Sequence, residues 1–488
     1  MHHIEIQKVN FEYQGANHLA LDNVNLSISR GSVVLLCGKS GCGKTSITRL
    51  INGLIPEFYD GALSGNIFIY QENILQKSVA DISAQVGSVF QNPKAQFFNL
   101  NTSDELTFAC QNKGLSKEFI LQKRNQVIQE FGIHELMDRS IFSLSGGEAQ
   151  KIACASVSCL EPDIIVLDEP SSNLDAKSIQ ELRIVLKRWK DKGKTLIISE
   201  HRLYYLLDIA DHIIYLNQGR IDMIFTPQEL FELPLDEYNQ LGLRARSLQE
   251  IDLLAKNQYA QQLMVDSKAT GFLSIKELQY FSKKNKPIIT IKNITLHNQH
   301  IYALVGNNGE GKSTFLKSLA GLNHSVGQLE WHRKSVKAKY MSRLAYLVMQ
   351  DVNHQLFTES LLSEVLLSMR KLKLPLEQKK DRALSILQAL NLSDFIKVHP
   401  MNLSGGQKQR LAVASAIASE KPIILFDEPT SGLDYQSMLD VAQIIQSIAY
   451  NRIIVIATHD PEFIRQCATD IMFFEQGTIK NIQSLTQV

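Results

Sequence analysis

Two glycine-rich segments of this chain have the residue types and spacing that bind phosphate groups. Each reads Gly-x-x-x-x-Gly-Lys followed by Thr or Ser, at residues 38–45 and 306–313. Glycines let backbone N–H groups turn toward phosphate oxygens, and the helix that follows adds the positive end of its dipole. The lysines would reach the outer phosphates, and the hydroxyls would bind Mg²⁺. The predicted ATP-binding residues of these loops are Gly38, Ser40, Gly41, Gly43, Lys44, Thr45, Gly306, Asn308, Gly309, Gly311, Lys312 and Ser313.

Acidic pairs follow two short apolar runs further along the chain. Asp168-Glu169-Pro170 and Asp427-Glu428-Pro429 are placed identically in the two halves. In each pair the aspartate can hold Mg²⁺, directly or through water, and the glutamate can polarise an attacking water for in-line hydrolysis. His201 and His459 each follow a later apolar run. A lone histidine there would usually be structural, but beside these motifs we expect both to contact the γ-phosphate and the catalytic water.

A third motif, Leu-Ser-Gly-Gly followed by Glu or Gln, opens a helical pattern in each half. Its N–H groups and helix dipole again suit a phosphate. The predicted ATP-binding residues of this motif are Ser145, Gly146, Gly147, Ser404, Gly405, Gly406 and Gln407.

The elements that must position these residues repeat in register. From Gln91 to Ser145 and from Gln350 to Ser404 the separation is 54 residues in both halves, so one fold is duplicated. Unbroken apolar runs, such as 33–36 and 164–167, predict strands of a parallel sheet that is buried on both faces. Five apolar positions between 179 and 189 predict a helix that packs on the core. We predict two α/β domains, at 1–231 and 271–488, with a linker at 232–270.

Composition narrows the possible functions. The 488 residues carry a net charge of +1, which argues against a function driven by nucleic-acid binding. The six cysteines have no disulfide or metal-ligand spacing, so reduced thiols are expected. Cys42 lies within a phosphate loop, and we expect thiol reagents to modify it and ATP to protect it. The sequence predicts neither a bilayer-spanning segment nor a secretion signal, so a membrane role would need a partner.

Together these motifs resemble the ATP-binding cassette (ABC) ATPases over nearly the whole chain. The resemblance implies two P-loop NTPase domains, each with a mainly parallel sheet, an N-terminal antiparallel β part and a helical subdomain. It also implies that the two cassettes of one chain pair head to tail. Each ATP would then lie between the phosphate loop of one cassette and the Leu-Ser-Gly-Gly segment of the other, and both sites would hydrolyse.

Further site residues come from the same resemblance. Gln91 and Gln350 would bind Mg²⁺ and take part in catalysis, and Tyr13 would stack on adenine. The second-half position aligned with Tyr13 is Ser282, which leaves Tyr280 and Phe281 as alternatives. Glu148 and Lys151 stand where the second half has Gln407 and Arg410. The two sites are therefore expected to be similar rather than identical.

A shared pattern, Gln-x-x-x-x-Gln-(Phe/Leu)-Phe at 91–98 and 350–357, is similar to energy-coupling factor (ECF) importer ATPases. Residues 52–56 and 199–203 are also similar to fused two-cassette members of that type. The resemblance implies a transmembrane coupling subunit, a separate small membrane protein that binds a vitamin or a transition metal, and a place at the cytoplasmic face of the membrane. Phe97, Phe98, Leu356 and Phe357 would line a docking groove or simply belong to the core.

Two other classes remain as alternatives. A tandem ATPase of a sugar importer also has two cassettes, although the intact second acidic pair and the glutamine pattern argue against it. An ABC-F-like translation factor would have a long charged arm between its cassettes and a more basic chain. The transported substrate is not encoded in an ATPase that never touches it.

Overall fold

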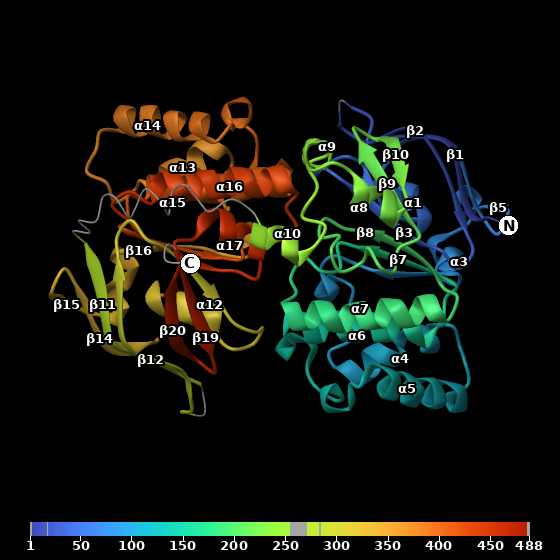
Figure 1. Ribbon diagram of the computed structural model, residues 1–488, viewed down its shortest axis with the longest axis horizontal. Helices are drawn as coiled ribbons and strands as arrows, with labels where there is room; N and C mark the ends of the chain where they lie inside the picture. Colours follow the sequence, from blue (N-terminus) through green and yellow to red (C-terminus); the bar gives the residue numbers. More distant parts are fainter. Residues whose placement is uncertain (1, 17, 254–270, 283–284, 486–488) are drawn as a thin grey trace. The chain divides into compact units, whose positions relative to one another are not determined.

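The computed structural model describes residues 2–16, 18–253, 271–282 and 285–485, which form two compact units at 1–248 and 249–488 (Figure 1). Each unit contains a mainly parallel sheet, an antiparallel sheet and a group of helices. This architecture confirms the predicted fold class.

The central sheet of the first unit carries the chemistry at the ends of its strands. Within the described residues its order is β10-β9-β3-β8-β7-β6, parallel except for β10. The strands are β3 (Val33–Gly38), β6 (Val86–Val89), β7 (Ile164–Asp168), β8 (Thr195–Ser199), β9 (His212–Asn217) and β10 (Arg220–Phe225).

Alternate residues of β3 enter two different cores, which explains its unbroken apolar run. Val33 and Leu35 pack with helices α6 (Gly146–Cys159) and α7 (Ala176–Asp191). Val34 and Leu36 pack with helix α1 (Lys44–Ile51) and the antiparallel sheet on the opposite face. A strand covered on both faces has no polar side to expose, so every residue of β3 is buried.

The antiparallel sheet of the first unit has the order β2-β1-β4-β5. It consists of β1 (His2–Tyr13), β2 (Leu21–Ser29), β4 (Gly61–Ile69) and β5 (Glu72–Asn73). Two short helices, α2 (Leu54–Glu57) and α3 (Val79–Ile82), complete this part of the unit.

Three helices form the predicted helical subdomain of the first unit, and Figure 1 shows them gathered beside α7. Helices α4 (Thr102–Asn112) and α5 (Lys117–Phe131) pack against α6. The predicted core face of α7 is confirmed, because the apolar residues of its inner face are buried: Ile179, Leu182, Val185, Leu186 and Trp189.

The second unit repeats this plan. Its central sheet has the order β16-β17-β18-β13-β19-β20, and its antiparallel sheet the order β12-β11-β14-β15. The strands are β11 (Phe272–Phe281), β12 (Pro287–His297), β13 (Ile301–Val305), β14 (Val326–Trp331), β15 (Lys334–Lys337), β16 (Ala345–Val348), β17 (Ile423–Asp427), β18 (Ile453–Ala457), β19 (Asp470–Glu475) and β20 (Thr478–Ser484). The helices are α12 (Lys312–Leu319), α13 (Leu361–Ser368), α14 (Leu376–Ala389), α15 (Gly405–Ala418), α16 (Tyr435–Ile448) and α17 (Pro461–Cys467).

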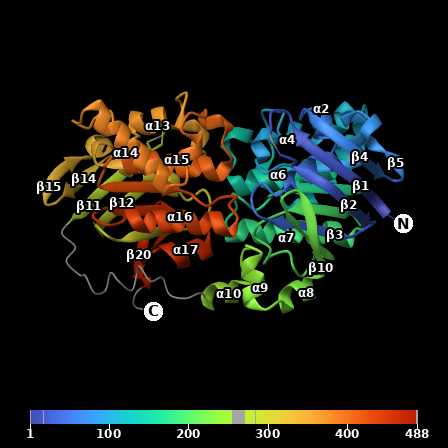
Figure 2. The same cartoon turned by 90° about the horizontal axis from the view of Figure 1, so that it is seen from above.

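The segment after Phe231 packs on the first unit instead of starting a linker there. Helices α8 (Pro227–Glu232) and α9 (Leu235–Gln240) lie together beyond β10 in Figure 2, and α10 (Leu248–Leu253) follows along the chain. Tyr238, Leu241 and Leu243 belong to the core of the first unit, and the Tyr215 hydroxyl donates to the Leu241 carbonyl at 3.0 Å. The predicted linker start at residue 232 therefore differs from the division at residue 248, because these apolar contacts join the segment to the first unit. The predicted linker residues 254–270 lie outside the described residues.

Candidate functional site

Both phosphate loops join a central strand to a helix, as the motif requires. The first loop connects β3 to α1, and the second connects β13 to α12. A Cβ on Gly38 would lie 2.2 Å from the Leu216 carbonyl oxygen, and one on Gly306 would lie 2.1 Å from the Phe474 carbonyl oxygen. Only glycine fits where the loop passes this close to a neighbouring strand. The loop backbone is therefore fixed by its contact with the sheet.

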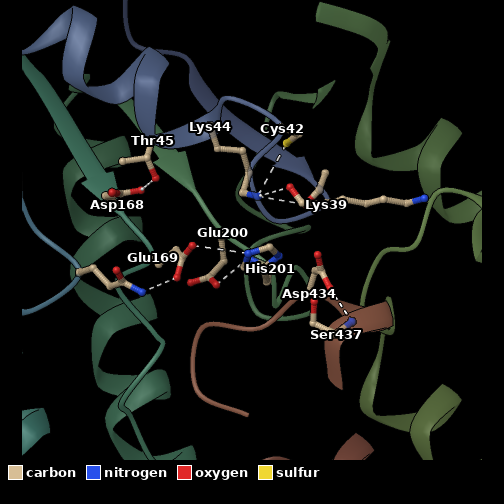
Figure 3. A network of polar contacts seen from close by, with 12 residues as sticks. Lys39, Cys42, Lys44, Thr45, Asp168, Glu169, Glu200, His201, Asp434 and Ser437 are labelled. Atoms are coloured by element: carbon tan, nitrogen blue, oxygen red, sulfur yellow. Dashed lines mark hydrogen bonds and ion pairs between the residues drawn. The ribbon is translucent and has the colours of Figure 1, made fainter. Parts of the chain in front are cut away.

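The two loop lysines are buried, and their ammonium groups have different neighbours. The Lys44 ammonium donates to the carbonyls of Gly38 at 3.0 Å and Lys39 at 3.1 Å (Figure 3). The Lys312 ammonium donates to the carbonyl of Gly306 at 2.6 Å, and it also lies 2.9 Å from His459 Nε2. Each ammonium is thus held over its own loop, where a phosphate group would bind.

A hydroxyl and a carboxylate meet beside each loop. The Thr45 hydroxyl donates to Asp168 at 3.2 Å, and the Ser313 hydroxyl donates to Asp427 at 3.0 Å. Burial, with the neighbouring Glu169 charge, raises the pKa of Asp168 to about 6, and burial also raises the pKa of Asp427. A carboxylate and a hydroxyl both offer the hard oxygen donors that fit Mg²⁺, and the charge of the ion would favour the ionised form of the carboxylate. Among the described residues no cluster of three or more His, Cys, Asp or Glu could hold a metal by itself, so phosphate oxygens and water would complete this site.

The glutamates after these aspartates have a strained backbone. Glu169 and Glu428 adopt φ angles of +44° and +49°, in the left-handed region that non-glycine residues rarely occupy. The backbone N–H of Glu169 donates to the Ser199 carbonyl and that of Glu428 to the Ala457 carbonyl, both at 2.8 Å. These bonds hold the turn that aims each side chain away from the sheet.

The predicted catalytic groups of the first unit converge on Glu169 (Figure 3). The Gln91 amide donates to Glu169 Oε2 at 2.6 Å, and His201 Nε2 lies 3.5 Å from Glu169 Oε1. In the second unit, His459 Nε2 lies 3.6 Å from Glu428 Oε1. Gln350 lies in the loop that follows β16, the position that Gln91 occupies after β6. The structure thus brings together Gln91, Glu169 and His201 in the first unit, and it brings His459 to Glu428 in the second.

The third motif starts a helix in each unit. The Ser145 hydroxyl caps α6 by accepting the Glu148 N–H, and the Ser145 N–H donates back to Glu148 Oε2 at 2.8 Å. Ser404 and Gln407 make the same reciprocal pair at the start of α15. This capping box explains why Glu and Gln both occur at the fifth position of the motif.

Glu148 also has a cationic partner. Gln407, at the same position in the second unit, is neutral and cannot form such an ion pair. The Arg139 guanidinium donates to Glu148 Oε1 at 2.8 Å. Burial opposes ionisation of Glu148, but the Ser145 N–H and the Arg139 guanidinium together lower its pKa. Lys151, the other unusual residue of this helix, forms an ion pair with Glu181 at 3.1 Å.

The second glutamine of the glutamine pattern has a structural role, which the sequence did not reveal. Its second glutamine, Gln96, accepts the Phe90 N–H at 3.1 Å and donates to the Ser88 carbonyl at 3.0 Å, which closes the loop. Gln355 makes the equivalent bonds to Met349 at 2.9 Å and to Leu347 at 2.6 Å. The second glutamine therefore shapes the loop in each unit, and the first glutamine of the first unit, Gln91, reaches Glu169.

Two buried glutamates, also missed from the sequence, fix the end of these loops. Glu105 accepts the backbone N–H groups of Phe98 at 3.0 Å and Asn99 at 2.9 Å, and Glu364 accepts those of Phe357 at 2.9 Å and Thr358 at 3.0 Å. Each glutamate stands seven residues after its phenylalanine, a recurrence that could have identified it.

The apolar residues of this pattern divide between surface and core. Phe98 is 77% exposed and Phe357 is 74% exposed, whereas Leu356 is buried and Phe97 is partly buried. Phe97 and Leu356 therefore pack on the core, whereas Phe98 and Phe357 are exposed and available to a partner.

Tyr13, the expected adenine-stacking residue, lies at the end of β1. Its hydroxyl is 3.0 Å from the Ser46 hydroxyl and accepts a hydrogen bond from Arg49 at 3.0 Å. The ring is therefore anchored to α1. In the second unit Tyr280 packs on the core and Ser282 belongs to the turn after β11. Stacking of Tyr280 or Phe281 on adenine in this unit stays a prediction.

The expectation of a reactive Cys42 is wrong. Its side chain is only 4% exposed, and burial raises the pKa of the thiol above its ordinary value. A buried thiol that stays protonated reacts slowly, because the thiolate is the nucleophile. The loop turns Cys42 inward beneath Gly38, where a Cβ would lie 2.8 Å from its sulfur.

Comparisons with known proteins agree with this geometry. The family profile described as "ABC transporter" matches residues 21–172 and 290–431. A "Putative ABC transporter ATP-binding protein" of Treponema denticola is 40% identical over 98% of this chain and 96% of its own length. A "Putative HMP/thiamine import ATP-binding protein" of Bacillus subtilis is 30% identical over 96% of this chain and 89% of its own length.

A solved structure is similar in fold over almost the whole chain. A model of ribosome-bound archaeal Pelota and ABCE1 aligns with 97% of this chain and 78% of its own, at a TM-score of 0.66 and 21% identity. No helix among the described residues is long and apolar enough to cross a bilayer. With two matched cassettes and near-complete coverage of its relatives, this chain belongs to the ABC transporter ATP-binding proteins, which hydrolyse ATP.

Proposed function

We propose that this chain is the ATP-hydrolysing subunit of an ECF-type importer for a vitamin or a transition metal. The observation that carries the proposal is the glutamine loop of each unit. A buried glutamate holds the loop in place, and the loop presents one exposed phenylalanine. The relative named for HMP/thiamine import supports the substrate class. The chain would act at the cytoplasmic face of the membrane, without nucleic acid.

The exposed phenylalanines would receive the transmembrane coupling subunit. Phe98 stacks on Phe108 at 5.1 Å, and the Glu105 carboxylate holds its backbone in place. An apolar ring on a rigid loop loses little conformational entropy when a partner covers it. Gln91 begins the same loop and contacts Glu169, so movement of the partner would reach the catalytic carboxylate. A separate small membrane protein would bind the cargo.

Two composite ATP sites are proposed on the basis of family membership. One would join Lys44, Thr45, Gln91, Asp168, Glu169 and His201 to Ser404, Gly405, Gly406 and Gln407. The other would join Lys312, Ser313, Gln350, Asp427, Glu428 and His459 to Ser145, Gly146, Gly147 and Glu148. One chain would then supply both halves of each site.

Within each site the residues have separate tasks. Lysine would bind the outer phosphates, and the Thr45–Asp168 and Ser313–Asp427 pairs, with Gln91 and Gln350, would hold Mg²⁺. When bound, Mg²⁺ would neutralise charge on the phosphate oxygens. Glu169 and Glu428 would accept a proton from the attacking water, and the histidines would orient the γ-phosphate. Tyr13 would stack on adenine in the first site.

Two alternatives make different predictions. A sugar-type tandem ATPase would also bind a membrane partner but not a small cargo-binding membrane protein. An ABC-F-like factor would bind ribosomes; the likeness to the Pelota and ABCE1 structure reflects the fold only at 21% identity.

Co-purification from detergent-extracted membranes tests the proposal. The tagged chain should retain a polytopic membrane protein and a second, smaller one, and replacing Phe98 and Phe357 with Ser should reduce recovery of the coupling subunit at least tenfold. ATP turnover of the isolated chain should stay unchanged, since neither ring contacts the catalytic groups.

Tyr450→Ser provides the matched control. This residue is 72% exposed and lies between α16 and β18, at the end of the sheet opposite to the glutamine loops. Its replacement should leave recovery unchanged. Co-sedimentation with ribosomes and no retained membrane protein would contradict the proposal and favour the translation-factor class.

A further inference from the structure

A buried carboxylate stands beside each catalytic histidine, but at different chain positions. The first unit reads Ser199-Glu200-His201-Arg202, and the second reads Ala457-Thr458-His459-Asp460. The carboxylate thus precedes the histidine in one unit and follows it in the other. Glu200 is 2% exposed and Asp460 is 1% exposed. Buried carboxylates are costly unless they accept several hydrogen bonds.

Glu200 ties the histidine loop to the segment that follows Glu169 (Figure 3 shows its place beside His201). Its Oε1 accepts the N–H groups of His201 at 2.7 Å and Arg202 at 3.2 Å. Its Oε2 accepts the Ser171 N–H at 3.3 Å and the Tyr205 hydroxyl at 2.9 Å. One carboxylate therefore joins the two loops that carry His201 and Glu169.

Asp460 makes the equivalent connection in the second unit with different atoms. Its Oδ2 accepts the Thr430 hydroxyl at 2.9 Å, and its Oδ1 accepts the Phe463 N–H at 3.2 Å at the start of α17. Its own N–H donates to the Thr458 hydroxyl at 3.1 Å. Thr430 follows Pro429 just as Ser171 follows Pro170, so both carboxylates reach the same place in the fold.

A third position changes together with the carboxylate. Tyr205 and Phe463 each stand four residues after the histidine. Burial, followed by the Glu200 charge, raises the pKa of Tyr205 well above its ordinary value, so the phenol stays protonated and can donate. Phe463 needs no hydroxyl, because Asp460 accepts its backbone N–H instead. Three positions therefore change together. The first unit has Glu200, Arg202 and Tyr205 where the second unit has Thr458, Asp460 and Phe463.

We propose that Glu200 is a positioning residue of the first ATP site, where it sets His201 against Glu169 as Asp460 sets His459 against Glu428. The inference rests on the proposed roles of these glutamates and histidines. The hydrogen bonds of the Glu200 carboxylate go to His201, Arg202, Tyr205 and Ser171, so it acts through His201 and the Ser171 segment. Its loss would therefore lower turnover and leave ATP affinity in place.

The experiment uses the full chain and measures turnover, ATP affinity and melting temperature. Glu169→Gln first defines the share of turnover that belongs to the first site. Glu200→Thr should remove about nine-tenths of that share or more, because four hydrogen bonds are lost, while the Kd for ATP stays within about twofold. Unchanged turnover in Glu169→Gln would contradict the catalytic role proposed for Glu169, which separates that failure from failure of the Glu200 inference.

Transplanting the other unit's arrangement distinguishes positioning from general support of the fold. The variant E200T/R202D/Y205F should recover more than half of the lost share, since Ser171 offers an aspartate at position 202 the hydroxyl that Thr430 offers Asp460. Arg202→Ala serves as the control for the loss of that buried side chain, and its turnover is compared with that of the triple variant. A folded triple variant with no recovery overturns the proposal, as does full turnover in Glu200→Thr. Should Glu200→Thr alone not fold, the folded triple variant should keep more than half of the first site's share of turnover, and less than that overturns the proposal.

Discussion

The two units share their predicted catalytic groups and differ in the residues that hold those groups. Both place a loop lysine, a hydroxyl–aspartate pair and a left-handed glutamate at the ends of the same strands. Yet His459 contacts the phosphate loop through Lys312 and Asn308, each at 2.9 Å, whereas no hydrogen bond joins Lys44 and His201, both of which the structure describes. Duplication therefore kept the chemistry while the supporting contacts diverged, so the units should respond differently to equivalent changes.

The largest effect should come from the catalytic glutamates. Glu169→Gln together with Glu428→Gln should lower ATP turnover at least about a hundredfold and trap bound ATP, because an amide cannot accept the proton of the attacking water. The measurement is phosphate release, with retained nucleotide after gel filtration.

The single variants then compare the sites. Equal losses from Glu169→Gln and Glu428→Gln would indicate equivalent sites, and unequal losses would rank them. Wild-type turnover in the double variant would refute the roles given to both carboxylates.

Replacing the histidines should show a clearer difference between the two units, because only one of the two variants should also weaken ATP binding. His201→Ala and His459→Ala should each lower turnover about tenfold to a hundredfold. His459→Ala should also weaken ATP binding several-fold, since it loses hydrogen bonds to two residues of the phosphate loop, each worth about 1 kcal/mol. ATP titration followed by fluorescence measures the difference.

A conservative variant controls for this effect. His459→Gln keeps a side-chain nitrogen and should retain more of the affinity than His459→Ala. Equal ATP affinities in His201→Ala and His459→Ala would show that the contact between His459 and the loop has no role in binding.

Replacing the second glycine of the Leu-Ser-Gly-Gly motif should affect the stability of the chain differently in the two units. A Cβ on Gly147 would lie 2.2 Å from the Ser178 hydroxyl oxygen, but one on Gly406 would lie 3.8 Å from that of Ser437. Gly147→Ala should therefore destabilise the chain by about 1–3 kcal/mol through overpacking, whereas Gly406→Ala should be neutral or slightly stabilising. Scanning calorimetry measures the change, and adding Ser178→Gly should relieve it. Equal melting temperatures for the two alanine variants would contradict the close packing.

The smallest effect should come from Glu148→Gln, which copies the second unit. The capping box should persist, and loss of the half-exposed Arg139 pair should cost only a few tenths of a kcal/mol. Because the folded state lowers the pKa of Glu148 below its ordinary value of 4.5, its contribution is full above that pH and lost as the pH falls through the folded pKa. Melting temperatures of wild type and variant should thus converge under acidic conditions. A gap that widens on acidification would contradict the ion pair.

Sequence spacing predicted the reacting groups because each stands at the end of a buried strand or the start of a helix. Ser145 and Ser404 are examples, since a local capping box fixes both. The same reasoning misjudged Cys42, and it missed Glu105 and Glu200. Each depends on contacts between segments that only the folded sheet brings together.

The sequence by itself determined that one fold is present twice, because the register of its motifs suffices for this. Residue type and spacing also predicted which side chains would carry the chemistry. Tertiary structure alone decided the burial of Cys42 and the partners of the buried polar groups. The loop turns Cys42 inward, the Tyr215–Leu241 contact joins residues after 231 to the first unit, and Glu200 links two loops. The physical reason is that burial and hydrogen-bond satisfaction depend on neighbours distant along the chain, which spacing within one segment does not encode.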